Sequence, residues 1–319
     1  MHLNGLHHIT AVTAKIDHNV TFYTETLGLR LVKKSVNQDD VSAYHLFYAD
    51  QLGTPGTDIT FFDWAQIGPN VPGSDRIAGT AFRVDSAEAL EFWEDRLTSS
   101  PARQIQQADF GELKLISFLD PEGQQLYLVN DQGAPFEGET WDRPDIPEGY
   151  LLKGFYSVIL STPEPVQIHE ILVSGLNYEW IDRAVWIDGS TPVRRYRTHP
   201  GGGPGAEVWV LEEPARSPGR LGAGSVHHAA FRVKDQEAQE EWRSKLRKSG
   251  IHATQVIDRF WFKSIYFRIS RGILFEIATE GPGFTVDESL DSLGESLVLP
   301  PFLESRREEI EADLTPIKA

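Results

Sequence analysis

Alternating apolar and polar positions divide the start of the chain into short strands and one helix. Residues 6–13, LHHITAVT, form a β-branched run that is typical of a buried strand. In DHNVTFYTETLG, Val20, Tyr23 and Leu27 recur at helical spacing, which predicts a helix over 17–27 that ends at Gly28. Further strands are expected at 29–36, 43–49 and 58–63.

The same order of elements recurs along the chain. A strand at 77–84, a helix at 86–98 and strands at 102–107, 112–119 and 124–129 form a second unit, whose DPEG turn has good hairpin chemistry. A third unit starts at LLKGFYSVILS, and a fourth starts at SVHHAAFRV and ends with SIYFRIS and ILFEIAT. We therefore predict an α+β fold of four β-α-β-β-β modules, paired into two domains.

Two long stretches of the chain match each other without a gap. AFRVDSAEALEFWEDRL at 81–97 aligns with AFRVKDQEAQEEWRSKL at 230–246, an offset of 149 residues. The repeat indicates an N-terminal domain at 1–133, a Pro/Gly-rich linker at 134–150, a C-terminal domain at 151–281 and a tail at 282–319. In the tail, Pro300 and Pro301 are expected to open a helix that reaches about residue 313, with Phe302, Leu303 and Ile310 on its apolar side.

Composition narrows the possible functions. Hydrophobic residues make up 40% and charged residues 24% of the chain, as in ordinary globular proteins. A net charge of −17 argues against nucleic acid and anionic membranes as partners. No apolar run is long enough to span a membrane, and MHLNGLHHIT has no signal-peptide pattern, so we expect a cytoplasmic protein. Without cysteine, any metal must be held by His, Asp or Glu.

Two histidine doublets lie in strand-like segments, His7–His8 and His227–His228. Buried histidines are uncommon and need partners. Because neighbours in a strand point to opposite faces, we expect only one histidine of each doublet to face a given cavity. The repeat aligns His8 with Ser157 and His228 with Gly79, so the candidate ligands survive only in modules one and four.

A carboxylate completes the candidate metal site. Glu276 interrupts the apolar strand RGILFEIATE, where a charge is costly unless it is paired or bound to a metal, and the second module has Tyr127 at the matching position. Two imidazoles and one carboxylate are the facial triad that leaves positions open on Fe(II). The sequence therefore predicts a metal site formed by His8, His228 and Glu276.

The four modules, together with LHHITAVT, VHHAAFRV and LFEIA, resemble the vicinal oxygen chelate (glyoxalase/bleomycin-resistance/extradiol dioxygenase) superfamily. Within it, nearly the whole chain resembles the hydroquinone ring-cleaving dioxygenases. The resemblance implies Fe(II), with Mn(II) as the other candidate, and substrates that are O2 and a small aromatic diol; we also expect a homo-oligomer. It further implies a set of pocket residues, which are His7, Thr10, His227, Arg259 and Tyr266.

In the mechanism that this resemblance implies, His227 or Tyr266 takes a proton from a metal-bound hydroxyl, and Arg259 stabilises an oxyanion or holds Tyr266. Catechol extradiol enzymes resemble the fold but take their ligands from modules three and four, which Ser157 disfavours.

Two further functions stay open. A glyoxalase-like isomerase or epimerase usually needs a fourth ligand, and DITFFDW offers no centred Glu. A metal-free binding protein of the bleomycin-resistance type would lack the His/His/Glu set. The glycine-rich stretch THPGGGPGAE is interpreted as a hairpin loop. The remaining histidines have no repeat partner and are interpreted as surface or incidental; they are His2, His18, His45, His169, His199 and His252.

Overall fold

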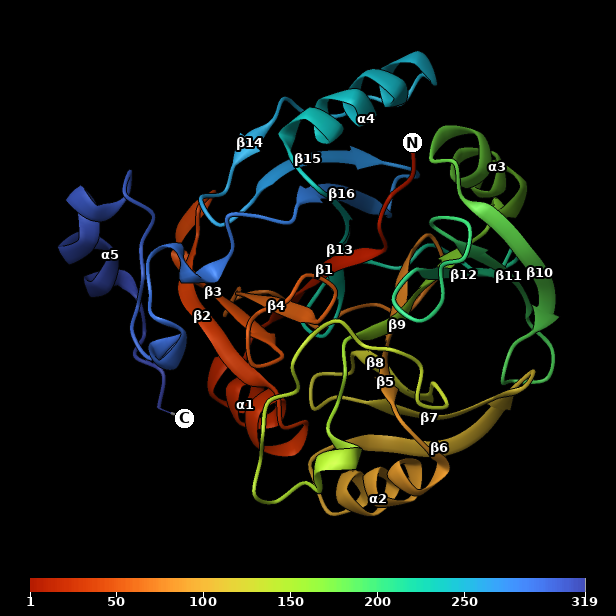
Figure 1. The fold of residues 1–319 in the computed structure, drawn as a ribbon, viewed down its shortest axis with the longest axis horizontal. Helices are drawn as coiled ribbons and strands as arrows, with labels where there is room; N and C mark the ends of the chain where they lie inside the picture. The colour runs from red at the N-terminus through yellow and green to blue at the C-terminus, as the bar shows by residue number, and fades with distance from the viewer. Residues whose placement is uncertain (319) are drawn as a thin grey trace.

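A computed structural model describes residues 1–318 and contains the four predicted modules (Figure 1). The elements of the first module are β1 (Leu6–Thr13), α1 (Ile16–Thr21) with a π-helical turn (Phe22–Thr26), β2 (Arg30–Asn37), β3 (Asp40–Ala49) and β4 (Asp58–Asp63). Those of the second are β5 (Arg76–Val84), α2 (Ala87–Thr98), β6 (Arg103–Phe110), β7 (Leu113–Leu119) and β8 (Gln125–Asn130). The strand and helix pattern expected for these modules is confirmed.

The second half of the chain repeats this arrangement. The third module consists of β9 (Phe155–Thr162), α3 (Pro165–Glu170) with a π-helical turn (Ile171–Gly175), β10 (Glu179–Val185), β11 (Pro192–Arg197) and β12 (Glu207–Glu212). The fourth consists of β13 (Val226–Val233), α4 (Gln236–Lys248), β14 (Ile257–Asp258), β15 (Lys263–Arg268) and β16 (Leu274–Thr279). The glycine-rich stretch is the loop of the β11–β12 hairpin, as expected.

The strands form two curved eight-stranded sheets. One has the order β14-β15-β16-β13-β1-β4-β3-β2, and the other has the order β10-β11-β12-β9-β5-β8-β7-β6. Module one therefore pairs with module four, and module two pairs with module three, through the antiparallel contacts β1–β13 and β5–β9. Each sheet combines modules from both sides of the segment at 134–150, so 1–133 and 151–281 divide the sequence but not the sheets. Independent folding of these parts stays a prediction.

The repeat is visible in how its helices begin and pack. Ser86 caps α2 by accepting a hydrogen bond from Ala89 N, and Asp235 caps α4 through Ala238 N. Trp93 and Trp242 lie at matching positions of these helices and are fully buried. The helices cover the outer faces of the sheets (Figure 1), which leaves the inner, concave faces for a site.

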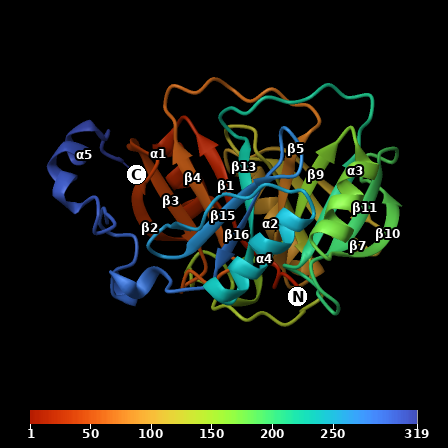
Figure 2. The ribbon, with the colours of Figure 1, turned by 90° about the horizontal axis from the view of Figure 1, so that it is seen from above.

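The C-terminal tail differs from its prediction. Its helix α5 (Arg307–Asp313) begins several residues after Pro301, because the chain first closes tight turns in which Leu303 N donates to Pro300 O and Arg306 N donates to Leu303 O. Leu303 and Ile310 are buried as expected, but these turns leave Phe302 58% exposed. The tail lies at one end of the molecule (Figure 2), where Leu297 bridges to Lys34 beside the β2 edge.

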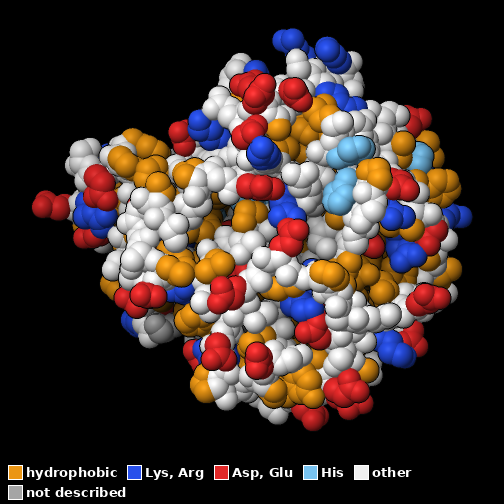
Figure 3. Space-filling model, in the orientation of Figure 1, with side chains coloured by type: hydrophobic (Ala, Val, Ile, Leu, Met, Phe, Trp, Pro, Cys, Tyr) orange, Lys and Arg blue, Asp and Glu red, His pale blue; other side chains and the backbone are white. Residues whose placement is uncertain are grey.

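Charged side chains of both signs are interspersed on the face shown in Figure 3. Within residues 1–318, no helix combines the length and the apolar character that crossing a membrane requires.

Candidate metal centre

Three neighbouring strands bring His8, His228 and Glu276 together. In the register of the sheet, Ala230 of β13 pairs with His8 of β1 on one side and with Glu276 of β16 on the other. His228 lies two residues before Ala230 and therefore on the same face of β13. The small Ala230 side chain leaves the space between the three larger ones open. The sheet register thus brings His8 to two residues that lie more than 200 positions further along the chain.

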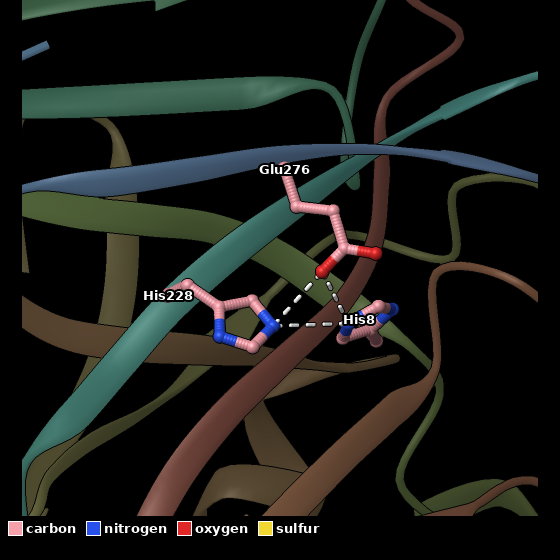
Figure 4. A group of neighbouring side chains, drawn as sticks. All are labelled: His8, His228 and Glu276. Carbon is pink, nitrogen blue, oxygen red and sulfur yellow. Dashed lines mark hydrogen bonds and ion pairs between the residues drawn. The ribbon is translucent and has the colours of Figure 1, made fainter. Parts of the chain in front are cut away.

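The ligand-type atoms of these residues converge on one point (Figure 4). His8 Nε2 lies 3.3 Å from His228 Nε2, and Glu276 Oε2 lies 3.3 Å and 2.9 Å from these two nitrogens. Cis ligands that bind a metal at about 2.1 Å lie about 3 Å apart. Glu276 is fully buried, and its Oε2 has no hydrogen bond of acceptable geometry to any described residue. The donor set and this orphaned oxygen fit a divalent cation.

In each doublet, the first histidine contacts the second, which is the candidate metal ligand. Register shifts between β1 and β13 place β-bulges at His7 and at His227. The two Nδ1 atoms of each doublet therefore lie within hydrogen-bond distance of each other. This distance is 2.9 Å between His7 and His8 and 2.8 Å between His227 and His228. Of each doublet, only His8 and His228 line the neighbouring pocket, as expected, and the bulges bring His7 and His227 into contact with them.

The partner of His7 determines its tautomer. Its Nε2 lies 3.1 Å from the carbonyl oxygen of Thr279, which can only accept, so Nε2 carries the proton. Burial, followed by the charge of His8, lowers the pKa of His7 to about 3, so the ring is neutral and its Nδ1 is an acceptor. His8 then donates from Nδ1, and its Nε2 is left with a lone pair for a metal.

Burial and neighbouring groups shift the pKa values of Glu276, His228 and His227. Burial acts to raise the pKa of Glu276, but the rings of His8 and His228 outweigh it and hold that pKa well below its usual value. Burial also lowers the pKa of His228, and burial together with His228 lowers the pKa of His227 to about 3. Ser264 Oγ donates to Glu276 Oε1 at 2.5 Å and orients the carboxylate.

A pocket with about 370 Å³ of empty space, part of it open to solvent, lies against this cluster. Two of the predicted pocket residues line it, Arg259 and Tyr266. The Arg259 guanidinium carbon lies 5.4 Å from the Tyr266 ring centroid, and both terminal nitrogens donate to Asp39, at 3.1 Å and 2.8 Å. Burial and then the charge of Glu276 raise the pKa of Tyr266, so its phenol keeps its proton at neutral pH.

The other three predicted residues, His7, His227 and Thr10, are not part of the pocket wall. Thr10 instead accepts a hydrogen bond from Thr60 Oγ1 at 2.9 Å. Thr60 is in turn 2.8 Å from Nε2 of His45, which does line the pocket. His45 was interpreted as surface or incidental, and this interpretation was wrong. The residue lines a cavity that forms only in the tertiary structure, and the sequence repeat gave no indication of it. The alternation in AYHLFYA was the available signal, since Tyr44, Leu46 and Tyr48 face the core.

The tail supplies part of the apolar surroundings of the pocket. Phe284 packs against Phe47 and Trp261, with ring centroids 5.2 Å and 6.3 Å away. Lys33, fully buried in β2, holds this segment through Phe284 O at 3.1 Å, Asp287 Oδ1 at 2.8 Å and the carboxylate of Glu288. No motif in the tail indicated this role, because the contact joins residues some 250 positions apart.

Comparisons with known proteins agree with this architecture. A profile of the Glyoxalase/Bleomycin resistance protein/Dioxygenase superfamily matches residues 5–128. The chain is 39% identical over 318 residues to the "Putative ring-cleaving dioxygenase MhqA" of Bacillus subtilis, covering 100% of both chains. It is 32% identical over 319 residues to the chlorohydroquinone/hydroquinone 1,2-dioxygenase of Sphingobium indicum, covering 97% of this chain and 95% of that one.

The crystal structure of a "putative dioxygenase" from Bacillus subtilis superposes with a TM-score of 0.91 at 35% identity, covering 99% of this chain and 98% of that one. The likeness therefore extends over the whole chain and not over a single module. The chain belongs to the Glyoxalase/Bleomycin resistance protein/Dioxygenase superfamily, in its group of ring-cleaving dioxygenases.

Proposed function

We propose that the protein is an Fe(II)-dependent dioxygenase that opens the ring of a hydroquinone-type para-diol with O2. Mn(II) is the other candidate metal. The observation that carries this proposal is the convergence of His8, His228 and Glu276 within 3.3 Å of one another at the wall of an aromatic-lined pocket. Its support from relatives is the name of the Sphingobium protein, a hydroquinone 1,2-dioxygenase with which this chain aligns almost end to end.

The three candidate ligands indicate which chemistry a bound metal would supply. Fe(II) bound there would supply open positions for a substrate hydroxyl and for O2, and would lower the pKa of that hydroxyl. Because both oxygen atoms enter the product and the ring supplies the electrons, a dioxygenase needs no external reductant.

The chain's own residues bind the ring and stabilise charge. Phe62, Trp261 and Phe262 line the pocket and exclude water from the diol. Tyr266 keeps its proton and can donate a hydrogen bond to an oxygen that becomes negatively charged, and Arg259 adds a nearby positive charge. His227 has a low pKa and does not line the pocket, so orienting His228 suits it better than accepting a proton.

Metal analysis combined with oxygen consumption tests the proposal. Protein purified in air should be poorly active and should regain activity with Fe(II) and a reductant. With hydroquinone, methylhydroquinone, catechol and 3-methylcatechol, kcat/KM should be higher for the hydroquinones, and simple phenols should be inert. Cleavage of catechols alone would contradict the para-diol assignment. Turnover of a methylglyoxal–thiol adduct without oxygen uptake would replace it with the isomerase function. A cytoplasmic location and a homo-oligomeric state stay predictions.

A further inference from the structure

His45 lies in the pocket wall with no role in the metal cluster. Its ring is packed between Phe47 and Phe62, with centroid distances of 4.0 Å and 4.5 Å. Its Nε2 is 2.8 Å from Thr60 Oγ1, which fixes the ring on its inner side. The same pocket is lined by His8 and His228, so a small ligand bound at the cluster shares a cavity with His45.

The hydrogen bonds behind His45 determine which ring nitrogen carries the proton. Thr60 Oγ1 uses its own proton to donate to Thr10 Oγ1, so its oxygen accepts from His45 Nε2–H. Burial, and then the neighbouring His8 and His228, keep the pKa of His45 well below its usual value, so the ring is neutral. A neutral ring with its proton on Nε2 has a lone pair on Nδ1.

Several other polar groups of the pocket are already engaged, and the phenol of Tyr266, which keeps its proton, is available as a donor. The terminal nitrogens of Arg259 donate to Asp39, the amide of Gln38 donates to the Arg259 carbonyl, and Asn37 Oδ1 accepts from Asp39 N. By contrast, Nδ1 of His45 has no hydrogen-bond partner in residues 1–318, and it is not among the side-chain atoms sealed from solvent. The pocket therefore contains an acceptor that is prepared for a ligand's donor.

Building on the proposed function, we propose that His45 is a specificity-determining residue whose Nδ1 accepts a hydrogen bond from the second hydroxyl of the para-diol. β3 is separated from β1 by β4, two strand spacings or roughly 10 Å, so His45 faces the cluster from further along the curved sheet. One hydroxyl of a para-diol lies at the cluster while the other points away from it. The two adjacent hydroxyls of a catechol both lie at the cluster and leave Nδ1 unpaired, which penalises that substrate.

The test compares hydroquinone with 4-methoxyphenol, which keeps the first hydroxyl but has no proton to donate at the second oxygen. Binding to the metal-loaded protein is measured by calorimetry without oxygen. The wild type should bind hydroquinone about tenfold more tightly than 4-methoxyphenol. His45→Phe keeps a ring between Phe47 and Phe62 and should abolish this preference. His45→Asn places an amide oxygen near the position of Nδ1 and should restore part of it.

The matched control is His169→Phe in helix α3, which lies outside the pocket and contacts β11 of the other sheet. There, His169 Nδ1 lies 2.9 Å from Tyr196 OH, so the change also removes a histidine–hydroxyl bond but should leave the preference unchanged. An unchanged preference in His45→Phe, or an equal loss of both ligands, overturns the inference. If the wild type consumes oxygen with hydroquinone, such a result overturns the role of His45 alone. If the wild type neither binds hydroquinone nor consumes oxygen with it, the proposed function fails as well.

Discussion

Each of the two curved sheets has a concave inner face, here called its cup. The two cups are equivalent in backbone, but only the cup of the sheet that contains β1 and β13 has the residues of a metal centre. Both are built around an alanine of the central strand, Ala230 in one sheet and Ala81 in the other, with the same pairings and with bulges at equivalent positions. In the second sheet, Ser157 and Gly79 stand at the places of His8 and His228, and Tyr127 stands at the place of Glu276. The backbone frame is therefore shared, and the side chains make the difference.

Aromatic side chains fill the second cup. Phe110, Trp186 and Trp209 pack with Tyr127 and Tyr156 at centroid distances of 4.9–5.9 Å. A Cβ at Gly79 would lie 2.7 Å from the Tyr127 ring, so a larger residue at this counterpart of His228 would have to displace that ring. The comparison shows that the same backbone arrangement can be filled with aromatic side chains, which stabilises the fold, or can be left open for a ligand. A metal site replaces apolar contacts with buried polar groups that need a cation or a partner.

The largest difference between the cups should appear when their central residues are replaced. His8→Ala, His228→Ala and Glu276→Ala should each lose nearly all bound metal and activity, because each removes one of only three ligands in the cluster. The counterparts Ser157→Ala and Tyr127→Phe should keep both. Metal content by mass spectrometry and circular dichroism check the two sets. A folded His8→Ala protein with full metal occupancy and activity would falsify the cross-module site.

Removing a buried tryptophan of the filled cup should affect stability instead. Trp209 is fully buried, and its Nε1 donates to Glu207 at 2.7 Å. Trp209→Ala should lower the free energy of unfolding by about 3–5 kcal/mol because it leaves a cavity. Denaturant titration measures this loss. Metal content per folded molecule should not change, and a parallel loss of metal would show that the two cups are coupled.

Tyr266→Phe separates chemistry from metal binding within the first cup. The substitution removes only the hydroxyl, so kcat should fall by about 10²-fold while metal content stays the same. Tyr127→Phe, in the equivalent strand of the filled cup, is the control and should leave kcat unchanged. An unchanged kcat in Tyr266→Phe would assign Tyr266 to packing.

A smaller effect concerns two carboxyl groups at matching positions, Asp58 and Glu207. Both oxygens of Asp58 are buried without a hydrogen-bond partner in the described chain, and burial, then Asp50, raises its pKa well above the usual value. The folded state therefore keeps a proton that the unfolded state releases. Stability falls as pH rises from about 4, the unfolded pKa, towards the raised folded pKa.

Asp58→Asn should remove this pH-dependent loss. We expect the variant to be more stable than wild type by on the order of 1–2 kcal/mol at pH 8, with the difference shrinking towards pH 4. Glu207→Gln should bring no such gain, because Glu207 already accepts from Trp209. Thermal unfolding between pH 4 and pH 8 measures both variants. A difference that does not vary with pH would contradict the titration of Asp58.

Local patterns were enough to predict much of the fold and the three metal-ligand candidates. The strand at 58–63 agrees with β4 to the residue, because a short β-branched and aromatic run has few alternatives. The offset of 149 residues aligned His8, His228 and Glu276 with Ser157, Gly79 and Tyr127, because a duplicated module keeps its register. The beginning of α5 was missed, because turns after Pro300 and Pro301 depend on tail packing.

The sequence by itself determined the four modules, the repeat and the chemical type of the cluster, since these follow from periodicity and from the cost of a charge in an apolar strand. The metal site predicted from His8, His228 and Glu276 already required modules one and four to meet. Only the tertiary structure decided that they do so by antiparallel pairing of β1 with β13, that bulges at His7 and His227 join each doublet through Nδ1, and that His45 faces the pocket. The same holds for Lys33, whose partners lie in the tail. These features depend on sheet register and on contacts between distant segments, which no local pattern encodes.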